Sequence, residues 1–330
     1  MATAKKLPSG SWRVRAYVGK DSDGKAIYKS FTAPTKKDAE LLALAYKGET
    51  ESSAMSVVDA LNAYTALKSG VLSPSTVAGY KRMTKNCFEK IGNIALDALT
   101  TADIQRWISS MAQDKSPKTV SNAWGLLSSA IKMYRPDFAP HVTLPQKRKQ
   151  KIAIPEQDEI RRMRTALVGT DLELPFLLAT QCGLRASEIA ALSPADFDLD
   201  ELTVTIDKAL VMGEFGAEMK APKSYAGYRT LPCSAEIAGM VSALEGGKVW
   251  RNSPAVLSSA WSKFVRSEGF HPYNFHALRH YFASRAALAG IPKEYLVELM
   301  GHSSSKMLDK VYLHTFQSAK NVFADKLREI

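Results

Sequence analysis

The first fifty residues alternate apolar or aromatic positions with polar ones, a period of two that is typical of β-strands. Residues 11–17 (SWRVRAY) alternate with arginines, residues 21–24 (DSDG) form a turn signal, and residues 26–32 resume the strand pattern. A helix is expected next, with Thr35 as its N-cap and residues 38–46 as its body. The pattern predicts a small three-stranded sheet followed by one helix.

A purely helical pattern fills residues 55–140. The polar residues 49–54 (ETESSA) before it show no periodicity and are expected to form a linker. Two helix starts are marked by Ser-Pro pairs at Ser73 and Ser116, because proline is tolerated in the first helical turn. After the helices, residues 145–151 (PQKRKQK) read as an exposed basic connector. The expected helices cover 57–67, 75–91, 101–113 and 118–134.

From residue 152 onward, apolar density rises and helical and strand patterns mix. The expected elements are helices at 172–181 and 185–192, a strand at 202–211, a turn at 213–216 and a strand at 228–231. The fold class is therefore mixed and mainly α, with a second small β-hairpin sheet in the last part. We predict three domains, at 1–50, 55–145 and 152–330.

Composition narrows the class of protein. The chain has 330 residues, of which 45% are hydrophobic. It contains no apolar run of the ~18–20 residues that a membrane span needs, and its first residues, with two lysines and no apolar core behind them, are not expected to form a secretory signal. The three cysteines, Cys87, Cys182 and Cys233, form neither a disulfide framework nor a zinc ligand set, which fits a reducing cytoplasm. A net charge of +11 favours a polyanionic partner such as nucleic acid.

The positive charge is spread over the first two predicted domains and their connector. Residues 1–50 carry ten Lys/Arg against five Asp/Glu, and residues 55–145 carry ten against six. A basic sheet with aromatic side chains can lie in a major groove, and one-signed helix faces can contact phosphates. Alternatively, these charges only keep the surface soluble. The candidate DNA-binding residues are Arg13, Arg15, Tyr17, Lys25, Lys29, Lys81, Arg82, Lys85, Lys118, Lys147 and Arg148, and the exposed sheet face is expected to carry Trp12 and Tyr28 as well.

The last fifth of the chain gathers side chains that can break a phosphodiester. A helix is expected from the N-cap Asn274 to Gly290, and it sets His276 and Arg279 on one face. A second short helical pattern ends at Gly301. Without a metal, such chemistry needs guanidinium groups to hold the phosphate, a nucleophile and a proton donor for the leaving oxygen. Each residue alone has an ordinary structural explanation.

Five blocks in sequence order change this interpretation. They read QCGLRASEIAAL, KAPKSYAGYRTLP, HALRH, LMGHSS and VYLHT. On these blocks the chain resembles the tyrosine recombinase (phage integrase) family over essentially its whole length. The blocks are degenerate singly and specific together. The N-terminal segment is similar to an arm-type DNA-binding domain, and the helical segment resembles a four-helix, SAM-like core-binding domain.

The resemblance implies a role for each matching catalytic position. The two arginines would clamp the scissile phosphate, the lysine would protonate the leaving 5′ oxygen, one histidine would help to deprotonate the nucleophile and the other would bind the phosphate. The tyrosine would form a 3′-phosphotyrosyl link. These residues are Arg185, Arg279, Lys223, His276, His302 and Tyr312. One ester replaces another, so neither a metal nor ATP is implied.

The resemblance also implies partners. It implies a site-specific recombinase of a temperate phage or integrative element, acting on double-stranded core and arm sites as a homotetramer, with accessory DNA-bending and directionality proteins. The expected location is the nucleoid in the cytoplasm of a bacterial host, away from membranes. The amphipathic residues 316–330 are expected to pack on a neighbouring protomer or to cap their own domain.

Several alternatives stay open at the level of sequence. Lys220 lies three residues before Lys223 and competes with it as the acid, although we favour Lys223. Tyr225, Tyr228 and Tyr281 also lie near the blocks, but only Tyr312 has the flanking YxH pattern.

Glu188 and His280 lie close in sequence to the matching arginines, and each is expected to have a structural role. Glu188 is expected to support the first arginine, and His280 is expected to be a buried hydrogen-bonding residue. His276 and His280 also stand at zinc-binding spacing, yet position 277 is Ala and not the Glu of HExxH. The rival functions are therefore a DNA-binding protein without catalysis, a metal-dependent hydrolase and a topoisomerase with the same chemistry.

Overall fold

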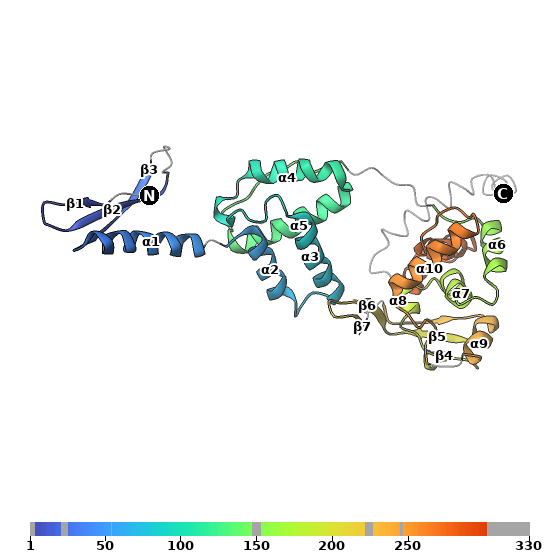
Figure 1. The fold of residues 1–330 in the computed structure, drawn as a ribbon. Coiled ribbons are helices and arrows are strands. Elements are labelled where there is room, and N and C mark those ends of the chain that lie inside the picture. The colour runs from blue at the N-terminus through green and yellow to red at the C-terminus, as the bar shows by residue number, and fades with distance from the viewer. Residues whose placement is uncertain are drawn as a thin grey trace. The chain divides into compact units, whose positions relative to one another are not determined.

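The computed structural model describes residues 4–20, 26–53, 55–146, 153–221, 227–244 and 247–301. The chain divides into two compact units, one of residues 1–71 with 79–147 and the other of residues 72–78 with 148–330. Small antiparallel sheets accompany many helices (Figure 1), so the mixed, mainly α fold class is confirmed. In the described part of the chain, none of the helices combines the length and hydropathy of a membrane span.

The N-terminal segment is a three-stranded antiparallel sheet covered by one helix. The strands lie in the order β1-β2-β3, and their number agrees with the predicted three-stranded sheet. Val14 and Ala33 are buried on the sheet face that packs against Ala39 of the helix. Thr35 caps this helix, since its Oγ1 accepts the amide of Asp38 at 3.2 Å. The elements are β1 (Lys5–Lys6), β2 (Trp12–Lys20), β3 (Ala26–Ala33) and α1 (Lys36–Ser53).

Helix α1 is longer than predicted. It continues to Ser53, so residues 49–53 are helical and the prediction of a linker over 49–54 is wrong for them. The segment lacks hydrophobic periodicity, but glutamate is a good helix former and the preceding turns supply the hydrogen bonds that extend a helix cheaply.

The next segment contains the four predicted helices. Three of them start at side-chain caps, where Ser56, Thr100 and Ser116 each accept an amide at 3.2 Å from the residue three positions on. Their core is built around Trp107, which stacks on Phe88 with ring centroids 5.0 Å apart. The elements are α2 (Val57–Lys68), α3 (Pro74–Cys87), α4 (Thr101–Asp114) and α5 (Pro117–Tyr134), with a 3₁₀ turn at Leu96–Ala98.

The last unit packs helices against a small sheet. The fully buried Trp261 lies at its centre against Phe176 and Phe275, with centroids 6.0 and 5.8 Å away. Strands β4, β5 and β8 pair antiparallel, with Val204 opposite Leu231 on the buried face. The helices are α6 (Gln157–Leu167), α7 (Glu173–Gln181), α8 (Ala186–Ile189), α9 (Ala235–Ser242), α10 (Pro254–Ser267), α11 (His276–Leu288) and α12 (Lys293–Leu299). The strands are β4 (Phe197–Asp198), β5 (Thr203–Ile206), β6 (Ala209–Met212), β7 (Ala217–Lys220) and β8 (Arg229–Pro232).

Two predictions for this unit need correction. The single strand predicted over 202–211 is two strands in different sheets, because β5 joins β4 and β8 whereas β6 pairs only with β7. The chain turns at Asp207 and Lys208, where Lys208 forms an ion pair with Asp196. The helix predicted over 185–192 is a single turn, α8, that ends at Ile189.

Candidate active site

A glycine turn sets the first predicted arginine at the start of a helix. Gly183 has a φ of 66°, and a Cβ there would lie 2.4 Å from the ring of Phe282, so both the backbone and the space require glycine. Arg185 follows as the N-cap of α8. Its amide donates to Glu188 Oε2 at 2.8 Å and its Nη1 donates to Glu188 Oε1 at 2.6 Å. Glu188 thus contacts Arg185 as predicted.

Helix α11 supplies His276 and Arg279 from one face. Asn274 Oδ1 accepts the amide of Ala277 at 3.0 Å, which fixes the start of the helix. The Arg279 side chain is 1% exposed and donates to the carbonyls of Gly183 and Met300. Arg185 is 31% exposed. Of the two arginines, only Arg185 therefore presents part of its guanidinium at the surface of the unit.

Glu188 is the centre of a buried charge cluster. Three guanidinium groups surround its carboxylate, at 2.6 Å from Arg185, 2.9 Å from Arg229 and 3.9 Å from Arg279. Burial raises the pKa of Glu188, but the charge and hydrogen bond of Arg229 outweigh it. With smaller contributions from Arg279 and Arg185, the pKa falls to about 2. One anion against three cations leaves a positive excess, which an anionic ligand would balance.

Three arginines also hold the end of helix α12. The carbonyl of Leu299 accepts from Arg229 Nε at 2.8 Å, that of Met300 from Arg279, and that of Gly301 from Arg185 Nη2 at 3.1 Å. The last carbonyls of a helix lack partners within it and carry partial negative charge, so cations stabilise them. The arginine cluster thus fixes the backbone of residues 299–301.

His276 is held in its neutral form. The protein packed around it is the largest cause that lowers its pKa, which falls to about 4. His280, Arg279 and Arg185 act in the same direction, and Glu188 opposes them. At neutral pH the ring can therefore accept a proton, as a general base must.

We expect the free energy of unfolding to fall as the pH is lowered from 6.5 to about 4. Over this window the unfolded chain takes up a proton at residue 276, whereas the folded chain, with a pKa of about 4, does not. His280, whose pKa is also lowered, adds to the effect. Urea unfolding at pH 7 and pH 5 measures it. His276→Gln should weaken this pH dependence, and an unchanged dependence would contradict the assignment.

The structure describes the surroundings of His280, which was expected to be a buried hydrogen-bonding residue. His280 is buried, as predicted, and its ring lies 4.8 Å from that of His276 in a T-shaped arrangement. The predicted hydrogen bonding is wrong for one ring nitrogen, since no group in the described chain pairs with the buried Nδ1. The described residues also contain no cluster of three or more His, Cys, Asp or Glu that could hold a metal ion.

Several predicted residues lie outside the described residues. Lys220 ends strand β7, and Tyr228 and Tyr281 lie in the last unit, so these three residues are described. The predicted amphipathic segment 316–330, by contrast, lies outside the described residues. So are Lys25, Lys147, Arg148, Lys223, Tyr225, His302 and Tyr312.

One residue of the charge cluster was not singled out from the sequence. Arg229 in GYRTLP contacts Glu188 and Leu299, yet no role was predicted for it. The signal was present in the strand alternation: Arg229 lies two residues from the buried Leu231 and opposite the buried Ile206, so it points to the apolar face.

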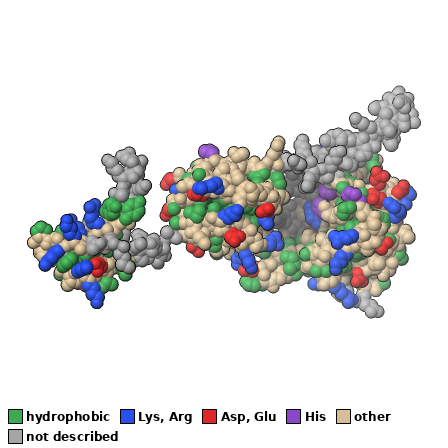
Figure 2. All heavy atoms as spheres, turned by 45° about the horizontal axis from the view of Figure 1, so that its top comes forward, with side chains coloured by type: hydrophobic (Ala, Val, Ile, Leu, Met, Phe, Trp, Pro, Cys, Tyr) green, Lys and Arg blue, Asp and Glu red, His purple; other side chains and the backbone are tan. Residues whose placement is uncertain are grey.

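The register of the N-terminal sheet sorts its basic residues by face. Arg13, Arg15 and Tyr17 share the face that α1 leaves open, with the Arg15 guanidinium 5.0 Å from the ring centre of Tyr28. Lys5, opposite Arg13, lies on the same face and was not predicted. Lys29 and Trp12, opposite Ala16 and Ala33, lie on the other face, so their predicted placement beside the arginines is wrong. Figure 2 shows Lys and Arg side chains on the surface of this unit.

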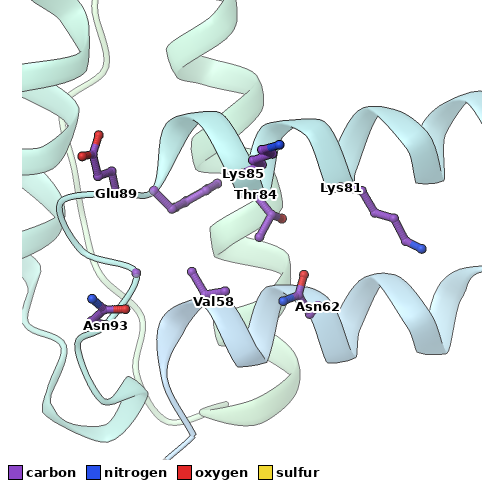
Figure 3. Close-up of a pocket in the computed structure, with 9 residues that line it drawn as sticks. Val58, Asn62, Lys81, Thr84, Lys85, Glu89 and Asn93 are labelled. Carbon is purple, nitrogen blue, oxygen red and sulfur yellow. The ribbon is translucent and has the colours of Figure 1, made fainter. Parts of the chain in front are cut away.

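A groove of about 440 Å³ lies between α2 and α3 of the helical segment. Lys81 and Thr84 point from α3 toward α2, and Asn62 points back (Figure 3). Lys85 also lines the groove, whereas Arg82 is exposed outside its lining. The exposed Lys118 stands in the first turn of α5. Lys81 and Lys85 thus line this groove together with one acidic residue, Glu89.

Comparisons with known proteins agree on one family. The model of the phage integrase family matches residues 150–318, more than half of the chain, and that of the phage integrase N-terminal SAM-like domain matches residues 57–112. A tyrosine recombinase XerC-like protein of Caldanaerobacter subterraneus is 22% identical over 97% of this chain and 96% of its own length.

Two solved structures share the fold. The integrase of transposon Tn1549 in complex with a circular intermediate DNA has a TM-score of 0.69 at 19% identity, over 84% of this chain and 100% of the other. A lambda integrase tetramer bound to a Holliday junction has a TM-score of 0.60 at 16% identity, over 94% of each chain.

Proposed function

Since this chain belongs to the phage integrase family, we propose that its arginine cluster holds a scissile DNA phosphate, which Tyr312 attacks. The protein is a site-specific tyrosine recombinase that cleaves and rejoins the DNA of a mobile element. The observation that carries the residue assignment is the cluster around Glu188, where one carboxylate meets three guanidinium groups beside a neutral His276.

The proposed reaction exchanges one phosphate ester for another. The Tyr312 oxygen bonds to phosphorus, the bond to the 5′ oxygen breaks, and the DNA 3′ phosphate remains on the tyrosine. Neutral His276 helps to accept the tyrosine proton, and Lys223 delivers a proton to the 5′ oxygen. His302 and Arg185 stabilise the charge on the phosphate. Attack by a 5′ hydroxyl of another strand reverses the step, so no energy source is consumed.

Arg279 is buried, whereas Arg185 is partly exposed. Its buried guanidinium donates to two backbone carbonyls in the DNA-free chain. To bind the phosphate directly it must exchange these hydrogen bonds, whereas from its present position it acts on the phosphate through its charge and by holding Gly183 and Met300.

We assign DNA contacts to two further surfaces. The open sheet face with Arg13, Arg15 and Tyr17 would bind arm sites, and the helical segment with Lys81, Lys85, Arg82 and Lys118 would bind the core site. Lys29 ranks below the others because it lies on the α1 side of the sheet. The expected assembly is a homotetramer on two DNA sites in a bacterial cytoplasm, with accessory bending and directionality proteins.

The two sheet faces allow a matched test of arm binding. We expect Arg15→Ala to weaken binding to DNA from the ends of the element by about 5- to 150-fold, since a base-reading arginine is worth about 1–3 kcal/mol. Lys29→Ala should change it less than about twofold. Fluorescence anisotropy of the full chain at one fixed salt concentration measures both. Equal losses for the two variants would contradict the face assignment.

The decisive experiment captures the covalent intermediate. The full chain is incubated with nicked DNA from its own element's junction in EDTA, denatured, and separated on a gel; the adduct is then digested and its peptide identified by mass spectrometry. We expect a DNA adduct on the peptide that contains Tyr312. Tight binding without an adduct would support a DNA-binding protein without catalysis.

A further inference from the structure

We propose that Arg229 is a positioning residue of the recombination site, which holds Glu188 and the end of α12 so that the groups acting on the phosphate are aligned. This inference rests on the proposed function and adds a residue to it. Arg229 is the first residue of β8 and follows the segment that contains Lys223.

The hydrogen bonds of Arg229 occupy all three guanidinium nitrogens. Nη2 donates to Glu188 Oε2 at 2.9 Å and Nη1 to Glu188 Oε1 at 3.2 Å, which is the fork that a carboxylate accepts. Nε donates to Leu299 O at 2.8 Å, and Nη1 also reaches Gly227 O at 3.3 Å. The side chain is 4% exposed. It is therefore committed to the protein and has no surface to offer DNA.

These bonds join three segments that are distant in sequence. Glu188 is 41 residues and Leu299 is 70 residues away from Arg229. The first partner holds Arg185, and the second lies three residues before His302. Gly227 borders the segment of Lys223. One guanidinium thus connects Glu188, which contacts the proposed phosphate-binding Arg185, with the end of α12 and with Gly227.

Position matters more than charge in this arrangement. A catalytic group displaced by about 1 Å can cost on the order of 100-fold in rate. Lysine at 229 keeps the positive charge beside Glu188, but its three donors all lie on one nitrogen and cannot reproduce the planar fork that binds both carboxylate oxygens and Leu299 from three nitrogens. Arg229→Lys consequently separates alignment from charge balance.

The test measures single-turnover cleavage of nicked junction DNA by saturating full-length protein. We expect Arg229→Lys to bind the DNA within about twofold of wild type and to lower the rate constant of adduct formation about 10- to 100-fold. A purely structural defect lowers the fraction of DNA converted and not the rate constant. The matched control is Arg164→Lys, because Arg164 makes a similar two-bond contact with Glu236 on the surface; its rate constant should be unchanged.

The outcomes distinguish a failure of the proposed function from a failure of the role assigned to Arg229. If wild type forms no adduct, the proposed function fails, and the role of Arg229 fails with it. If wild type and Arg164→Lys react but Arg229→Lys reacts at the same rate, only the role of Arg229 is wrong. Should Arg229→Lys not fold, Arg229→Gln, which retains a donor but no charge, is measured in the same way, and a wild-type rate constant there overturns the proposal.

Discussion

Replacing Glu188 by Gln should lower the free energy of unfolding of the catalytic unit by about 3–5 kcal/mol, the cost of breaking a buried ion pair by removing one partner. The amide has nearly the same shape as the carboxylate but no charge. It leaves Arg229, 4% exposed, and Arg279, 1% exposed, without their shared counter-ion. The large effect arises from two uncompensated buried cations and not from the hydrogen bonds alone.

Glu236→Gln is the matched control for this substitution. Glu236 also accepts two hydrogen bonds from an arginine, Arg164, at 2.6 and 2.7 Å, but this pair lies on the surface. An exposed pair contributes about 1 kcal/mol or less. Urea unfolding of both variants of the full chain at pH 7 gives the comparison. A loss in Glu188→Gln no larger than that in Glu236→Gln would show that the cluster tolerates the missing charge.

Acid should reproduce part of this loss in the wild-type protein. The pKa of Glu188 is about 2 in the folded chain, against an ordinary value of 4.5. A lowered carboxyl pKa stabilises the folded state above pH 4.5, and this stabilisation is lost as the pH falls toward 2. The Glu188→Gln variant should lack that part of the acid dependence.

The features that were predicted well from the sequence are those that depend on a few neighbouring residues. The caps at Thr35 and Ser116 each act on an amide three positions away, so the local sequence contains the whole interaction. The helix after Ser116 was accordingly predicted almost to the residue, at 118–134 against Pro117–Tyr134, whereas the helix after Thr35 runs seven residues past its predicted end. Gly183 and Gly301, with φ of 66° and 56°, end or begin segments for the same local reason.

The features that sequence missed depend on distant partners. The predicted strand breaks at Asp207, beside an ion pair between Lys208 and the distant Asp196 that the alternating pattern does not predict. Lys29 was assigned to the wrong sheet face because its charge suggested the exposed face. Its pairing with Ala16, which the sequence does not show, places it on the face that carries α1.

In the candidate site, too, features that depend on neighbouring residues were predicted, and contacts between distant segments were not. The spacing of His276 and Arg279 placed both on α11, and the glycine turn placed Arg185 at the start of α8. The burial of Arg279 and the contact of Arg229 with Glu188 could not be predicted, because both arise where segments 41 or more residues apart pack together.

Replacing Tyr312 by Phe should abolish the covalent DNA adduct while leaving DNA binding within about twofold. The substitution removes one oxygen, which is the proposed nucleophile, so the ester cannot form at position 312; we expect a loss of at least about 1,000-fold. The measurement is the denaturing gel on nicked junction DNA in EDTA, with anisotropy for binding.

Tyr228→Phe and Tyr281→Phe are the matched controls, since each removes one hydroxyl from a tyrosine of the same unit. Tyr228 is 50% exposed, next to the arginine that holds Glu188, and Tyr281 lies on α11 two residues after Arg279. Both variants should retain the adduct on the Tyr312 peptide. An adduct that persists in Tyr312→Phe and disappears in one control would move the nucleophile to that tyrosine, whereas loss in all three would indicate that the hydroxyl groups act through folding, which the unfolding curves of the same proteins would reveal.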